Sequence, residues 1–207
     1  MPILGRGARA SGDFSMKLPV TRDLHDYWEW LKREREAPDR ADIDPVAIRH
    51  ILADTFIIEV DAKRRFPLRL CGARVNALWL GEQKGSPFLG WWRTRHRHDV
   101  AEAIRQVIDK ERPLVGHARA ETQGGEAAEF ELLLLPLRHF GNRRSRVLGS
   151  LAPARPPAWL GLCPIGQLDL VASRTLSERA PQASDEDWGL GSTLRLAASD
   201  GDSRSFP

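Results

Sequence analysis

Residues 130–138, with the sequence FELLLLPLR, constrain the fold more than any other part of the chain. The four consecutive leucines at 132–135 remove the alternation of apolar and polar residues that marks a strand with one face in water. Such a run is typical of a strand covered on both faces, and a buried helix is the alternative. Pro136 and the Gly124-Gly125 turn just upstream favour the strand, because proline does not fit the interior of a helix. We therefore expect a central strand, with the rest of the chain packed on its two faces.

The composition indicates one soluble domain. Of the 207 residues, 42% are hydrophobic, which is enough for the core of a single domain. No window approaches the roughly 18 consecutive apolar residues of a membrane span. Cys71 and Cys163 are too few for a disulfide scaffold or a zinc site, so a reducing cytoplasm is the predicted location. The net charge of +3, with 28 acidic residues spread along the chain, argues against dedicated nucleic-acid binding.

The two ends of the chain differ from its middle. Residues 1–18 are rich in Gly, Ala, Arg and Ser, which predicts a disordered leader, and either Met1 or Met16 could be the translation start. Residues 175–207 are polar and rich in Gly, Ser and Asp, which is typical of a disordered tail. Between them we expect one domain over residues 19–161, followed by an extended arm or an extra strand over residues 162–174.

The first half of this domain should begin with two helices. The first is predicted to start at Thr21 as its N-cap residue, to run to about Glu36 and to end before Pro38. A second, short helix is predicted to start at Asp44 as N-cap residue, with Pro45 at the first helical position.

The pattern that follows predicts a mixed α+β domain. Two strands are expected over residues 55–60 and 66–72, a short helix over 75–80, a longer helix over 93–111, and three strands over 114–122, 128–137 and 146–151. This order is satisfied by a five-stranded antiparallel sheet whose helices are inserted between strands 2 and 3, with the first helix covering the outer sheet face.

The order of elements resembles a PAS domain. Several runs are similar to the PAS-like single-domain proteins common in alphaproteobacteria: YWEWLKRERE, ADIDPVAIRHIL, FPLRLCGARVNALWLG, FELLLLPLR and RVLGSL. The resemblance covers residues 26–161. It implies a PAS-like fold and a small cytoplasmic protein that acts in signalling or cell-cycle regulation.

Strand alternation places Phe130, Leu132 and Leu134 of the central strand on one face of the sheet, together with Gly116 and Ala118 of the preceding strand. We expect this face to line a cleft that residues 75–92 cover. A concave, aromatic-lined cleft of this kind is the natural ligand site. The alternative, which the usual role of buried aromatics favours, is that these side chains simply fill the core. The cleft candidates are Trp79, Phe88, Trp91, Trp92, Gly116, Ala118, Phe130, Leu132 and Leu134.

The first helix should cover the other face of the sheet, towards which Glu131, Leu133, Leu135 and Leu137 point. An amphipathic helix in this position also suits dimerisation against a copy of itself. The predicted partner or dimer face consists of the residues that recur at helical spacing, Leu24, Tyr27, Trp28 and Leu31.

The sequence requires no cofactor or metal. His96 and His98 are haem candidates, because haem-binding PAS proteins often place a ligand histidine here, but the flanking arginines favour a polar, solvated helix start. The motif of light-sensing relatives is absent. By alternation Cys71 shares the face of Arg69, away from the cleft, and is expected to be a small buried residue.

Catalytic motifs are also absent, including Gly-x-Ser-x-Gly, a phosphate loop and His-Glu-x-x-His. We therefore expect a protein that is not an enzyme: a stand-alone PAS-type regulatory module, away from membranes, that forms a homodimer through its first helix. Its partner would be a signalling protein such as a histidine kinase or a cyclic-dinucleotide enzyme, with a small ligand in the cleft as a gate. The alternative is a small-molecule or haem-binding sensor or carrier.

Overall fold

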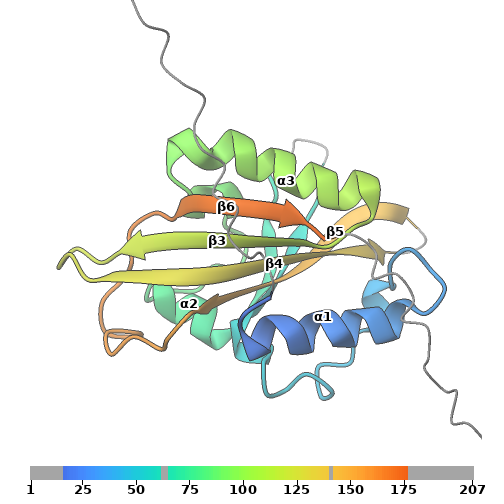
Figure 1. Ribbon diagram of the computed structural model, residues 1–207, viewed down its shortest axis with the longest axis horizontal. Helices are drawn as coiled ribbons and strands as arrows, with labels where there is room; N and C mark the ends of the chain where they lie inside the picture. Colours follow the sequence, from blue (N-terminus) through green and yellow to red (C-terminus); the bar gives the residue numbers. More distant parts are fainter. Residues whose placement is uncertain (1–15, 62–64, 140–141, 177–207) are drawn as a thin grey trace, which may run out of the picture. The chain divides into compact units, whose positions relative to one another are not determined.

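The computed structural model describes residues 16–61, 65–139 and 142–176. Within these ranges the chain forms a six-stranded antiparallel sheet with helices on both faces (Figure 1). The strands lie in the order β2-β1-β5-β4-β3-β6. They comprise β1 (Thr55–Glu59), β2 (Leu68–Cys71), β3 (Leu114–Glu121), β4 (Ala127–His139), β5 (Asn142–Pro153) and β6 (Asp169–Thr175). The α-helices are α1 (Pro19–Lys32), α2 (Ala73–Leu78) and α3 (Arg97–Lys110), and the short 3-10 helices are η1 (Arg40–Asp42), η2 (Leu52–Asp54), η3 (Phe88–Trp91) and η4 (Thr94–His96).

The leucine-rich segment is the central strand, as the sequence predicted. β4 pairs with β5 on one side and with β3 on the other, and its residues 130–137 are buried. Leu132 and Leu134 pack into the core beneath α3, which we call the cleft-side core. Leu133 and Leu135 pack into the core beneath α1, which we call the outer core. Figure 1 shows α3 and α1 on opposite sides of the sheet.

The predicted α+β arrangement is confirmed. The helices α2 and α3 lie between the second and third strands in the chain, and α1 covers the outer face of β4 and β5. A sixth strand, β6, pairs with β3 where the sequence left open an arm or an extra strand. Most of the expected leader (1–18) and tail (175–207) lies outside the described residues. No described helix is both long and apolar enough to cross a bilayer.

The helix predicted to begin at Asp44 does not form. The carboxylate of Asp44 accepts a hydrogen bond from the backbone N–H of Val46 at 2.9 Å, which closes a local turn instead of starting a helix. Further turns, closed by bonds between residues three apart, lead into η2. Burial of Ile48 and Ile51 in the outer core holds this segment, and that packing overrides the helix-start signal.

The bounds of α1 also differ from the prediction. The N-cap residue is Leu18, and Thr21 lies inside the helix with its side chain buried. The helix ends at Lys32 because Arg33 has a φ of 53°, outside the helical region.

A bulge in β2 corrects the predicted side of Cys71. The pairing of β2 with β1 skips Arg69 between two successive partners, so the alternation of faces slips by one residue. Cys71 therefore lies opposite Phe56 and packs against the cleft-side core, not away from it. Burial, followed by the charge of Glu82, raises the pKa of the Cys71 thiol to about 12, so the thiol stays protonated near neutral pH.

Candidate functional site

The roof of the predicted cleft consists of aromatic side chains that pack on one another. Trp91 stacks on Trp79 with 4.6 Å between the ring centroids, and it lies 5.0 Å from Phe88 and 5.4 Å from Phe56. Phe88 and Trp92 are completely buried. The aromatic residues singled out in this segment therefore form one continuous cluster within the cleft-side core.

The floor of the cleft is equally close-packed. The side chains of Ala118, Phe130, Leu132 and Leu134 are all buried in the cleft-side core. A Cβ on Gly116 would lie 3.6 Å from Cδ2 of Leu132, which is ordinary van der Waals contact. The structure thus brings the predicted cleft residues together on one face of the sheet, and ligand binding among them stays a prediction.

One polar group in this cluster has no partner. Nε1 of Trp92 is buried and makes no hydrogen bond to any described residue. An indole N–H that is removed from water without an acceptor carries a free-energy cost of about 1–3 kcal/mol. This buried N–H would suit a ligand that carries an acceptor atom.

The outer face contains a polar contact that the sequence analysis missed. Glu131, in β4, is 2% exposed, and its carboxylate accepts hydrogen bonds from the backbone N–H groups of Lys17 and Leu18 at 2.9 and 3.0 Å. These N–H groups lie immediately before α1, whose N-cap residue, Leu18, supplies no side-chain cap of its own. The carboxylate also lies at the positive end of the helix dipole. In the sequence, the signal for this contact is that one charged residue, Glu131, stands next to four leucines in a strand predicted to be buried.

Two further contacts fasten α1 and the segment after it to β4. Nε1 of Trp28 donates to the carbonyl oxygen of Pro136 at 2.8 Å, in a buried position. The backbone N–H of Arg138 donates to the carbonyl oxygen of Pro38 at 2.9 Å. The helix is therefore tied to the central strand at its start, in its second half and just beyond its end.

Most of the predicted partner face is used inside the chain itself. Leu24 and Trp28 are 0% exposed and Leu31 is 9% exposed, because all three lie in the outer core. Tyr27 is partly buried, and its hydroxyl oxygen accepts a hydrogen bond from the backbone N–H of Asp44 at 2.8 Å.

The aromatic residue that α1 presents to solvent is Trp30. Its exposure is 68%, and its ring lies 6.3 Å from that of Tyr27 in a stacked arrangement. Trp30 is not among the predicted partner residues, since it falls outside the apolar stripe of the helix. Its place on the polar side of the helix is the sequence signal that the ring would be exposed.

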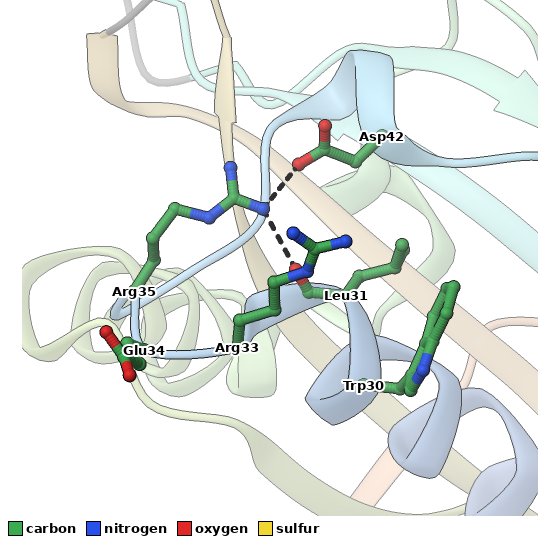
Figure 2. A pocket seen from close by; sticks show the side chains of 6 residues that line it. All are labelled: Trp30, Leu31, Arg33, Glu34, Arg35 and Asp42. Atoms are coloured by element: carbon green, nitrogen blue, oxygen red, sulfur yellow. Dashed lines mark hydrogen bonds and ion pairs between the residues drawn. The ribbon is translucent and has the colours of Figure 1, made fainter.

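A pocket of about 690 Å³ opens where α1 ends, as Figure 2 shows. Nη2 of Arg35 donates to the carbonyl oxygen of Leu31 at 2.9 Å and to the carboxylate of Asp42 at 2.7 Å. Burial acts to raise the pKa of Asp42, but the hydrogen bond from Arg35 and the charges of Arg35 and Arg33 outweigh it and lower that pKa. The pocket is lined by Trp30, Leu31, Arg33, Glu34, Arg35 and Asp42.

The haem candidates lie near the start of α3. Nε2 of His96 is 3.3 Å from a carboxylate oxygen of Asp169, and Arg93 and Arg95 contact the same carboxylate at 3.1 and 2.5 Å. His98 is exposed and lines a second pocket of about 200 Å³ between α3 and β6. Within the described ranges, no group of three or more His, Cys, Asp or Glu side chains is placed to hold a metal ion.

Comparison with known proteins decides the family. Residues 16–152 match a family model described as a PAS domain, which is more than half of the chain. The chain belongs to the PAS domain family. PAS domains are generally sensory signalling modules, so a role in sensing or signalling follows for this domain at that level of detail.

The solved structures similar to this PAS domain share little sequence with it. A Rhodobacter sphaeroides LOV protein is 15% identical, with a TM-score of 0.41, over 50% of this chain and 60% of the other. A PAS domain from Colwellia psychrerythraea is 13% identical, with a TM-score of 0.41, over 53% of this chain and 97% of the other. This chain therefore spans less than two thirds of the LOV protein's length. No functionally curated protein matches it.

Proposed function

We propose that this PAS domain is a regulatory module that acts in signal transduction by binding another signalling protein through the outer surface of α1. The exposed ring of Trp30 is the observation that carries the proposal. Tryptophan is among the residues that contribute most to binding at protein interfaces. On this helix the other apolar residues are largely committed to the outer core, and Trp30 alone of its large hydrophobic residues remains strongly exposed.

The exposed charges of α1 indicate what kind of partner would fit. Asp23, Asp26 and Glu29 are exposed on the same helix, against one exposed basic residue within it, Arg22. A partner surface with basic residues around an apolar recess would complement this face. The candidates are a histidine kinase, a cyclic-dinucleotide enzyme, or a second copy of this chain, and a cytoplasmic location is part of the proposal.

The test compares partner binding by the wild-type chain, Trp30→Ala and a control, Val171→Ala. Val171 is 66% exposed but lies on β6, so Val171→Ala removes exposed apolar surface at a distance from α1 and shows whether the loss of any exposed apolar group weakens binding. Purified candidate kinases and cyclic-dinucleotide enzymes are titrated onto the immobilised chain, and light scattering measures its own association. We expect Trp30→Ala to weaken partner binding at least tenfold. Equal binding by all three proteins would contradict the proposal.

A second candidate function is supported by the buried Nε1 of Trp92, which has no acceptor among the described residues. A small ligand that supplies an acceptor atom in the cleft would satisfy it, and such a ligand could gate partner binding. Native mass spectrometry and absorption spectroscopy of the purified protein test this idea, and haem would be visible directly. A co-purified molecule whose occupancy falls in Trp92→Phe is the expected result. An unliganded, colourless protein would argue for interaction alone.

A further inference from the structure

The pocket at the end of α1 lies on the opposite side of the sheet from the predicted cleft. It adjoins the last turn of α1, whose buried residues belong to the outer core. Its volume of about 690 Å³ falls within the range of roughly 300–1,000 Å³ that small-molecule sites occupy. Size alone therefore admits a ligand of the dimensions of a nucleotide.

One of the two arginines in the pocket is structural. The guanidinium of Arg35 donates to the carbonyl oxygens of Leu31 and Lys32 and contacts the carboxylates of Asp39 and Asp42. These contacts join the end of α1 to η1 and offset one of the two carboxylate charges. Arg35 thereby holds the pocket wall in place and has little hydrogen-bonding capacity left for a ligand.

The other arginine is available. Arg33 is exposed and makes no hydrogen bond or ion pair with any described residue, although its charge contributes to the lowered pKa of Asp42. Figure 2 shows its guanidinium group between Trp30 and Arg35. A guanidinium with free N–H groups is suited to bidentate binding of a phosphate.

Trp30 supplies a second group with which a ligand in the pocket could make contact. Its exposed indole is a flat surface on which a planar base can stack, and Leu31 lies beside it as an apolar element of the lining. Glu34 points away from Trp30 and from the guanidinium groups in Figure 2. The guanidinium of Arg33, unpaired within the described ranges, would therefore attract an anionic group bound beside Trp30.

We propose that this pocket binds a nucleoside monophosphate, with the base stacked on Trp30 and the phosphate bound by Arg33. Of the two arginines in the lining, Arg35 is already engaged by the carboxylates of Asp39 and Asp42, so Arg33 is the lining cation that remains for a ligand. A ligand with one phosphate group fits this single free cation better than a triphosphate, because each added charge would meet no additional free cation in the lining.

Calorimetric titration of the full chain with AMP, GMP and CMP tests the proposal, with adenosine and inorganic phosphate as half-ligands. The variants are Trp30→Ala and Arg33→Gln, and Arg22→Gln is the matched control, because Arg22 is an exposed arginine of α1 outside the pocket. We expect Trp30→Ala to weaken binding at least fivefold and Arg33→Gln about tenfold, with no change in the control. Thermal unfolding should be unchanged, because the substituted side chains are exposed.

Either half-ligand should bind more weakly than the mononucleotides, because each engages one side chain. Absence of heat at millimolar mononucleotide, or binding that both pocket variants retain, would overturn the proposal. Binding of a short single-stranded RNA without mononucleotide binding would do the same and indicate a nucleic-acid surface. Arg33→Gln distinguishes this proposal from the partner proposal, since it should weaken nucleotide binding and leave partner binding unchanged, whereas Trp30→Ala should weaken both.

Discussion

The two faces of the sheet are covered in different ways. The cleft side is covered by α3 and the aromatic cluster through apolar contacts, with Val100, Ile104 and Val107 buried beneath the helix. The outer side is covered by α1, which adds to its apolar stripe the polar contacts made by Glu131 and Trp28. Apolar packing is non-directional, whereas a hydrogen bond requires one position of the helix. The outer cover is therefore held on the central strand by hydrogen bonds as well as by packing, whereas the ion pairs at the start of α3 join it to Asp169 of the outermost strand, β6.

The exposed groups proposed to bind a partner or a ligand lie on the outer side of the sheet. Trp30 and the pocket belong to α1 and the segment after it, whereas the aromatic residues of the cleft are enclosed. The proposed partner surface and the proposed ligand pocket therefore both belong to the outer cover of the sheet.

The largest expected effect tests how tightly the cleft side is packed. A Cβ on Gly149 would lie 2.3 Å from the ring of Phe56 and 2.8 Å from the carbonyl oxygen of Leu133. Gly149→Ala should therefore lower the free energy of unfolding by about 3 kcal/mol, at the upper end of overpacking costs. Chemical denaturation measures this change. Gly124→Ala, where the nearest atom is 3.6 Å away, should change it little, and equal effects would contradict close packing at Gly149.

The second prediction compares one tryptophan from each face. Trp28 and Trp92 are both fully buried, but Nε1 of Trp28 donates to Pro136 while Nε1 of Trp92 has no partner among the described residues. Trp28→Phe leaves a buried carbonyl without its donor, and Trp92→Phe removes an unsatisfied group. Since the volume lost is the same, Trp28→Phe should cost about 2 kcal/mol more in unfolding free energy. Equal losses of unfolding free energy in denaturant titrations would contradict this difference in hydrogen bonding between the two faces.

The third prediction concerns the start of α1. Glu131→Gln replaces one acceptor oxygen by a donor that faces backbone N–H groups, so it should cost about 1–2 kcal/mol. The loss should be local, with faster hydrogen exchange at α1 amides than at those of α3. Glu129→Gln, an exposed position on the same strand, is the control. Uniform acceleration throughout the domain would show that α1 does not move separately.

The smallest expected effect on stability concerns Glu59, the last residue of β1. Glu59 contacts Arg69 of β2 and Arg146 of β5, and chiefly the hydrogen bond from Arg69 lowers its pKa from 4.5 to about 2. Because the folded-state pKa is depressed, this stabilisation is present above about pH 4.5 and is lost as the pH falls towards 2.

Glu59→Gln should therefore reduce stability at neutral pH by about 1 kcal/mol or less, since the pairs lie near the surface. It should also flatten the acid limb of the stability curve between about pH 4.5 and 2. Glu36→Gln, an exposed glutamate, should leave that limb unchanged. An acid limb that Glu59→Gln leaves as steep as in the wild type would contradict the assigned contacts.

Much of the fold follows from local sequence pattern. The leucine run at 132–135 has no polar alternation, and together with Pro136 and the Gly124-Gly125 turn it predicts a strand between two covered faces, as β4 proved to be. The stripes of α1 and α3 likewise report which side of each helix is buried. Periodicity succeeds here because it depends on the geometry of one element and on the burial of its side chains.

The features that distinguish this domain were decided by tertiary structure. Glu131 binds backbone groups more than a hundred residues away, the bulge at Arg69 changes the face of Cys71, and the pocket joins the end of α1 to Asp42. Each depends on which elements become neighbours and in what register. A local pattern carries no record of that choice, because the energy that sets it comes from contacts between distant segments.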